Sequence, residues 1–275
     1  MILPYIFVCT GVALAFILLS RYSYAWLFLG LTNIMVLAFA IEQPAQLHAI
    51  ARLRVADVAI GTVASLIVAT LIAPRAVPWR QTLRSISAAP KPGFATSLTP
   101  DARFRLVRHV SEAALGVTLV TALGYWFRLP NFTQAAITVL VVMIVPYADF
   151  EADRYRAVGR RLVLRGAGCL AGGLLGLLLL LITEFVPPLW WAALPVGIWI
   201  GEHLQTGDRR IGYFGTQFAF AFIVGFVQDV GGPRPGGDWG GYPAFQRLAG
   251  VLTGVAILAV IFGTSQLISA RLQRR

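Results

Sequence analysis

Three arginines recur with the same neighbours, and each opens a long apolar run. The pattern Arg-x-x-(Gly or Asp)-x-x-x-Gly occurs as Arg54/Asp57/Gly61, Arg165/Gly168/Gly172 and Arg247/Gly250/Gly254. A guanidinium is planar and permanently charged, so it is suited to bind a carboxylate. An arginine at the mouth of a span can also be an anchor whose head reaches the lipid headgroups. We keep both interpretations and predict Arg54, Arg165 and Arg247 as candidates for an anion path.

A hydroxyl residue followed by an amide residue precedes each of these arginines, on the preceding apolar run. The pairs are Thr32 with Asn33, Thr133 with Gln134, and Thr216 with Gln217. Such side chains can hydrogen-bond between helices, or they can line a polar path through the membrane. Both roles remain open, and we include the six residues among the candidates for the substrate path.

Three titratable residues are candidates to carry a proton. Asp57 replaces the first glycine of the pattern, and an ionisable group inside a span is costly and tends to be functional. Asp57 can also simply neutralise Arg54 or interact with a helix dipole. Glu202 and His203 follow Trp199, where we expect a short cytoplasmic turn, so ordinary solvation is their alternative role.

Glycines within the pattern are spaced four residues apart. Small residues at this spacing let two helices approach closely, so we predict a helix-packing role for them. The glycines concerned are Gly168, Gly172, Gly176, Gly250 and Gly254.

The composition excludes a soluble domain. The chain is 57% hydrophobic and 13% charged, with a mean hydropathy of +0.73, whereas soluble domains are about half apolar and a quarter charged. A spanning helix needs about 20 apolar residues, and continuous rather than alternating runs favour helices over a β-barrel. We therefore predict an all-α polytopic membrane protein with about nine transmembrane helices. The expected spans are 4–19, 24–41, 56–73, 111–128, 131–147, 163–183, 186–200, 211–228 and 246–268.

Three helices per repeat account for these spans. The predicted organisation is a three-span partial N-terminal half (1–75), a basic cytoplasmic linker (76–110), a six-span C-terminal half (111–270) and a basic tail (271–275). The linker ends in Thr99-Pro100-Asp101, a typical helix start. Since three is odd, successive units enter the membrane from opposite sides, as in the inverted repeats of transporters. Three units leave one unpaired, which suggests a missing unit upstream or on a separate chain.

The net charge of +11 is explained by sidedness. With the linker in the cytoplasm, 18 of the 23 lysines and arginines fall on the cytoplasmic side, as the positive-inside rule requires. We therefore predict an outside N-terminus and a cytoplasmic C-terminus, and no nucleic-acid partner.

Neither a cofactor nor an enzyme is indicated. The phosphate-binding run Gly-x-x-x-x-Gly-Lys-(Ser/Thr) is absent, and Lys91 is the only lysine. His48, His109 and His203 show no ligand spacing, and Cys9 and Cys169 lie in apolar runs, so we predict no metal site. No nucleophile and base are paired as in a hydrolase.

The second half resembles a known family. The stretch PNFTQAAITVLVVMIVPYADFEADRYRAVGRRLVLRGAGCLAGGLLGLLLLL, followed by GYFGTQFAFAFIVGFVQ and FQRLAGVLTGVAILAVIF, resembles the fusaric acid resistance and aromatic acid exporter family of bacterial inner-membrane proteins. The likeness covers about residues 111–268 and, through RLRVADVAIGTVASLIVATLIAP, the end of a preceding half. The chain departs from the family pattern in lacking the first three spans and in having a short linker.

The resemblance implies a function and partners. Family members have two six-span halves and export aromatic or other hydrophobic carboxylic acids, often beside a periplasmic adaptor protein, and a homodimer is plausible. The resemblance thus implies an inner-membrane exporter of weak organic acids, and we expect it to be proton-driven. Plant malate channels look like distant relatives, which leaves a passive organic-anion channel open. The missing unit leaves a third possibility, a non-transporting subunit that completes a partner's helix bundle.

Overall fold

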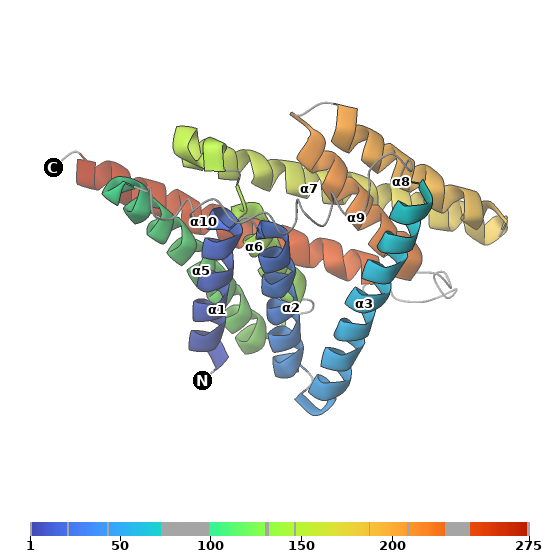
Figure 1. The fold of residues 1–275 in the computed structure, drawn as a ribbon, viewed down its shortest axis with the longest axis horizontal. Coiled ribbons are helices and arrows are strands. Elements are labelled where there is room, and N and C mark those ends of the chain that lie inside the picture. Colours follow the sequence, from blue (N-terminus) through green and yellow to red (C-terminus); the bar gives the residue numbers. More distant parts are fainter. Residues whose placement is uncertain are drawn as a thin grey trace.

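The structure is a computed structural model in which nearly all described residues are helical (Figure 1). It describes residues 2–20, 22–42, 44–72, 99–129, 132–145, 147–186, 188–207, 210–228 and 243–273. Within these ranges lie nine α-helices, one 3₁₀ turn and no strands. The elements are α1 (Ile2–Leu19), α2 (Ser23–Glu42), η1 (Pro44–Gln46), α3 (Leu47–Ile72), α5 (Pro100–Phe127), α6 (Phe132–Met143), α7 (Tyr147–Phe185), α8 (Leu189–Gly207), α9 (Gly212–Gln228) and α10 (Pro243–Gln273).

The all-α polytopic class is confirmed, and each predicted span corresponds to one helix. In the described part of the chain, five stretches are long and apolar enough to cross a membrane, and α6 and α9 contribute shorter apolar helices. The five are Ile2–Leu19, Ser23–Ile41, Pro100–Phe127, Asp153–Thr183 and Leu248–Leu267. Large apolar side chains are exposed along α1, α3, α7 and α10, as expected for surfaces that face lipid rather than water.

Several helix boundaries differ from the prediction. Helix α5 begins at Pro100, and its start is capped by Thr99, whose Oγ1 accepts a hydrogen bond of 3.3 Å from the Ala102 N–H. The predicted helix start at Thr99 is therefore confirmed, and residues 100–110 belong to a helix rather than to the linker. Helix α6 ends at Met143, shortly before Pro146, because a proline cannot donate the backbone hydrogen bond that a longer helix needs.

Helix α7 starts well before the predicted residue 163. Its long apolar segment follows a break at Asp153, whose backbone is extended (φ −159°, ψ 94°). The Asp153 carboxylate accepts a 3.1 Å hydrogen bond from the Arg156 N–H and so caps the helix that follows. Because the spanning segment is Asp153–Thr183, Arg165 lies near its middle and not at its mouth.

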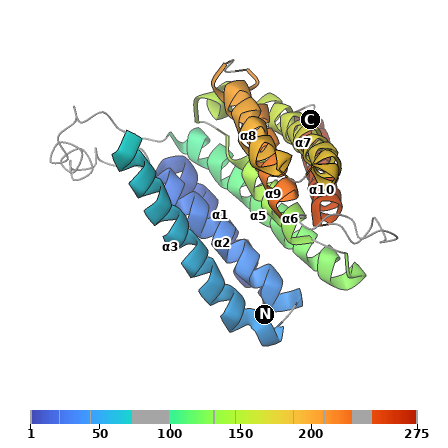
Figure 2. The same cartoon turned by 90° about the vertical axis from the view of Figure 1, so that its right-hand side faces the viewer.

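Helix α6 forms the centre of the molecule. It is buried along nearly its whole length and contacts α2, α5 and α10. Figure 2 shows α5 and α6 between the first three helices and the group formed by α7, α8, α9 and α10. Helix α3 contacts mainly α2 and η1 and lies at the outer edge of the first three helices (Figure 2). The main apolar core of the described residues is therefore formed around α6, with residues of α1, α2, α5, α7 and α10.

Candidate functional site

Arg165 is the most deeply buried of the candidate arginines whose side chains the structure describes. It projects from α7 with only 3% of its surface exposed. Its Nε donates a 3.2 Å hydrogen bond to Thr138 Oγ1 on α6, and its Nη1 donates to Gln217 Oε1 on α9. The Thr138 hydroxyl donates in turn to the Gln134 backbone oxygen at 2.8 Å, which leaves its lone pairs directed at the arginine.

The partners of Arg165 are neutral. Within the described ranges, no carboxylate lies at ion-pair distance from its guanidinium. Burying a charge without a counter-charge is costly, because hydrogen bonds to neutral groups replace only part of the lost hydration. An enclosed arginine is also not a headgroup anchor. The positive charge at this position is therefore available to an anion.

Glycines on α7 bring the helices close enough for these contacts. A Cβ atom on Gly168 would lie 2.7 Å from the Phe214 carbonyl oxygen, and one on Gly172 would collide with the Phe218 carbonyl. The contacts advance in the same direction along both helices, so α7 and α9 are parallel. Since Gln217 lies between the two phenylalanines, this close approach is what places its amide against Arg165.

The remaining predicted glycines also lie at helix contacts. A Cβ on Gly254 of α10 would lie 2.6 Å from the Ala135 carbonyl oxygen of α6, whereas at Gly176 the nearest atom, the Phe222 carbonyl oxygen, would be at an ordinary 3.6 Å. Gly250 is buried and borders a small cavity between α6 and α10. These positions fit the predicted packing role.

A small cavity lies beside Arg165. Its volume is about 40 Å³, and its lining includes Gln134, Arg165 and Cys169 with residues of α9 and α10. One buried water occupies roughly 10–15 Å³ on this measure, and ligand pockets are typically several hundred Å³. The cavity thus has room for a few waters and not for an aromatic acid.

Arg54 lies in a different environment from Arg165. It forms an ion pair of 3.5 Å with Asp57, and the two side chains are 33% and 62% exposed. Its other contact is with the Met35 sulfur on α2. Both residues border an open groove of about 790 Å³ between α2 and α3, and neither lines the Arg165 cavity. The structure therefore does not bring Arg54 and Arg165 to one place, and the side chain of Arg247 lies outside the described residues.

The hydroxyl–amide pairs divide between buried and exposed positions. Gln134 and Gln217 are buried, and both face the Arg165 site. Thr133 is also buried, and its Oγ1 has no hydrogen-bond partner in the described part of the chain. Thr216 is exposed and donates to the Gly212 backbone oxygen. Thr32 and Asn33 are half-buried on α2, away from this site.

The predicted turn at Glu202 and His203 is wrong. Both residues lie within α8, which continues to Gly207 because no further glycine or proline interrupts it after Gly201. Both side chains are exposed, and the His203 ring stacks on Trp199 with 5.4 Å between ring centroids. They are therefore not part of the Arg165 site.

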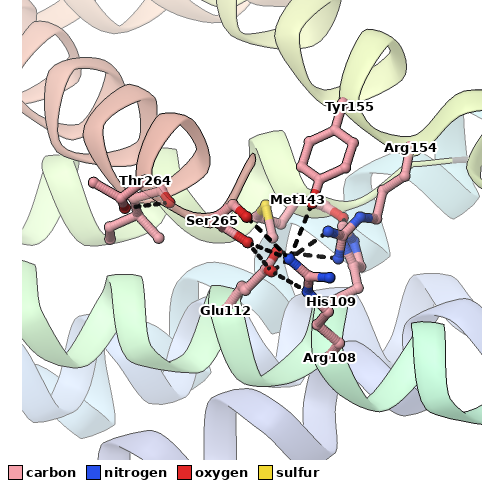
Figure 3. Close-up of polar contacts among 9 residues, drawn as sticks. Arg108, His109, Glu112, Met143, Arg154, Tyr155, Thr264 and Ser265 are labelled. Carbon is pink, nitrogen blue, oxygen red and sulfur yellow. Dashed lines mark hydrogen bonds and ion pairs between the residues drawn. The ribbon is translucent and has the colours of Figure 1, made fainter. Parts of the chain in front are cut away.

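A second polar cluster was not predicted from the sequence (Figure 3). Its centre is Glu112 on α5, whose side chain is only 12% exposed. The carboxylate pairs with Arg108 at 3.0 Å and with Arg154 of α7 at 3.1 Å, and it accepts a 2.7 Å hydrogen bond from the Ser265 hydroxyl of α10. A signal was present, since Glu112 is the only acidic residue in the predicted span 111–128.

The fold and the enclosed arginine define a class: a polytopic α-helical membrane protein with a buried, positively charged site. A family model described as fusaric acid resistance protein-like matches residues 117–262, which include α6, α7, α8 and α9 and therefore the whole Arg165 site. The chain belongs to this family, which indicates a membrane transport or resistance function. No curated protein and no solved structure matches the chain.

Proposed function

We propose that this protein exports aromatic or other hydrophobic weak organic acids across the bacterial inner membrane, driven by the proton gradient, and that Arg165 binds the substrate carboxylate. The observation that carries the proposal is the enclosed Arg165, which has only neutral partners and lies beside a cavity. The predicted orientation, with the N-terminus outside and the C-terminus in the cytoplasm, is part of the proposal.

The surroundings of Arg165 suit an acid with an apolar body. The guanidinium offers charged donors, and Gln134 offers an amide. The rest of the lining consists of Cys169 and of aromatic, aliphatic and glycine residues, including Phe220, Val224 and Leu248. A carboxylate would neutralise the arginine, and the apolar part of the substrate would contact the remaining wall. An uncharged polar solute would leave the charge unpaired, so the site favours anions.

Transport through this site requires the helices to move, because the cavity is too small for an aromatic acid. Inverted three-helix units would supply that movement. Reciprocal contacts between the second and third helices of the two units support this arrangement. Gly172 of α7 meets Phe218, the residue after Gln217, and Gly254 of α10 meets Ala135, the residue after Gln134. In each case the third helix of one unit packs on the second helix of the other, at the equivalent position.

A passive organic-anion channel is the second candidate function. The observation that favours it is the neutral surroundings of Arg165, since a channel needs a positive constriction and no titrating carboxylate beside it. In the exporter, the proton would be carried by Asp57, Glu202 or His203, which lie at a distance from the anion site. The third possibility is a non-transporting subunit that completes the helix bundle of a partner. The partner would be a separate segment, a second copy or a periplasmic adaptor.

Flux of a labelled hydroxybenzoate into proteoliposomes containing only this chain distinguishes these functions. A pH gradient at zero voltage is compared with a voltage at equal pH, and protein-free liposomes measure passive leak. The exporter predicts accumulation above leak under the pH gradient. Flux that follows voltage alone would establish the channel, and no flux under either condition would favour the subunit.

Arg165→Gln tests the site itself. We expect the flux to fall at least about tenfold, since a lost charge-assisted hydrogen bond costs roughly 1.5 to 3 kcal/mol, while insertion into the membrane is retained. Arg156→Gln is the matched control, because Arg156 lies on the same helix and is exposed. Equal flux in the two variants would refute the role of Arg165.

A further inference from the structure

We propose that Glu112 is the centre of an ion-pair latch that closes one end of the path to the Arg165 cavity. The inference rests on the proposed function of that cavity. It concerns a cluster made by four helices: Arg108, His109 and Glu112 on α5, Met143 at the end of α6, Arg154 and Tyr155 at the start of the long segment of α7, and Ser265 on α10 (Figure 3).

The contacts of Glu112 cross between helices. One carboxylate joins Arg108 on its own helix to Arg154 of α7 and Ser265 of α10. Arg108 in turn donates to the Tyr155 hydroxyl at 3.1 Å and to Ser265 Oγ at 2.7 Å. Neutralising Glu112 would therefore weaken the connections of α5 to α7 and to α10 together.

The neighbouring histidine extends the cluster to α6. His109 is fully buried, and its Nε2 donates a 2.8 Å hydrogen bond to the Met143 backbone oxygen. Met143 is the last residue of α6, so this bond holds the end of the central helix to α5. All four helices are thus tied together at one end of the molecule.

The cluster lies at a distance from the cavity along the same helices. On α7, Arg154 precedes Arg165 by 11 residues, or about 16 Å at 1.5 Å per residue. On α10, Val251 lines the cavity and Ser265 belongs to the cluster. Helices α6, α7 and α10 therefore contribute both to the cavity wall and to the cluster, so a separation of these ends would open the cavity from that side.

The charges of the cluster show that it is a latch and not a second anion site. Arg108 and Arg154 both point at a carboxylate already supplied by the chain, and Arg154 also lies over the Tyr155 and Phe262 rings at 4.6 and 5.5 Å. Arg165, in contrast, has no carboxylate partner among the described residues. In the predicted orientation the cluster lies at the cytoplasmic side, where the substrate of an exporter must enter.

The native cysteine Cys169 provides a reporter, because it lines the cavity and is 4% exposed. Replacing Cys9, the other cysteine, by serine leaves Cys169 as the single thiol. The rate of its reaction with a small charged thiosulfonate is then measured in vesicles of each orientation. A separate Arg103→Cys variant, also lacking Cys169, marks the side of the latch, since Arg103 is exposed near the start of α5.

Glu112→Gln is the main test. We expect it to raise the labelling rate of Cys169 at least about tenfold from the side on which residue 103 reacts, because removing one partner of a largely buried ion pair is strongly destabilising. Asp101→Asn in the same background is the matched control, since it neutralises an exposed carboxylate on the same helix, outside the cluster, and we expect no change. Equal rates in the two variants, or an increase only from the opposite side, would overturn the latch.

Size-exclusion chromatography in detergent shows whether Glu112→Gln folds. If it does not fold, Ser265→Ala provides a second test of the latch. It removes one hydrogen bond from the carboxylate, and we expect a smaller increase in the labelling rate from the same side. An unchanged rate in a folded Ser265→Ala protein would also overturn the proposal. Labelling requires no substrate, so a failure of the latch is distinguished from a failure of hydroxybenzoate transport.

Discussion

Replacing Gly172 by alanine should separate α7 from α9 and disrupt the Arg165 site. The added methyl group would collide with the Phe218 carbonyl, and it would also approach the Phe218 Cα at 3.0 Å. Both atoms belong to the backbone, so no side-chain rotation relieves the clash. Overpacking of this kind costs about 1 to 3 kcal/mol, which exceeds the gain of up to about 1 kcal/mol that alanine brings to a helix.

Gly159→Ala is the matched control for this substitution. Gly159 lies on the same helix, and an added Cβ there would meet no atom within 4 Å. It receives the gain in helix propensity without the clash. The two variants therefore carry the same chemical change on one helix, and only Gly172→Ala should be destabilised.

Two measurements compare the stability and the transport activity of the two variants. Thermal unfolding in detergent should show a lower midpoint for Gly172→Ala and an unchanged or higher midpoint for Gly159→Ala. Hydroxybenzoate flux should fall in Gly172→Ala, because Gln217 moves away from Arg165 as α9 shifts. Equal midpoints and equal flux in the two variants would refute the argument that close packing at Gly172 assembles the site.

Three further predictions concern the Gln217 contact, the cap of α5 and the orientation of the chain. Gln217→Leu removes a partner of Arg165 and should lower the flux with little change in membrane insertion, which a transport assay and a membrane-fraction blot would compare. Thr99→Ala removes the cap of α5 and should cost about 1 kcal/mol of stability; an unchanged unfolding midpoint would contradict this. A cysteine at position 103 should react with an impermeant reagent only after permeabilisation gives access to the cytoplasmic side. Labelling in intact cells would contradict the predicted orientation.

The helices could be predicted from the sequence because hydropathy alone determines which segments can cross a bilayer. Each expected span corresponds to one helix, and the cap at Thr99 followed from a local signal. The helix starts were less accurate. Helix α7 extends back through a charged stretch that contains Arg154 and Arg160, since tertiary contacts there satisfy side chains that a hydropathy count assigns to water.

The candidate site could be predicted in part. The recurring pattern identified Arg165, Gly168, Gly172 and Gln217, which do meet in space. Thr138 could not be selected from the sequence, because its position one turn after Gln134 matters only once α7 packs beside α6. The same pattern identified Arg54, which the structure leaves in an exposed pair with Asp57. The glycine of this copy, Gly61, also makes no close helix contact, since an added Cβ there would meet no described atom within 4 Å. A shared pattern therefore does not place its members at one site.

Burial distinguishes two carboxylates of which the sequence analysis selected only one. Asp57 is the second residue of the predicted span 56–73 and was a candidate to carry a proton, yet its side chain is 62% exposed. Glu112 is likewise the second residue of a predicted span, 111–128, and its side chain is only 12% exposed. The cost of a charged group depends on the helices packed around it, not on its own segment. Glu112 is retained at that cost because α5, α7 and α10 each supply a donor, so the carboxylate is stable only while these helices stay together.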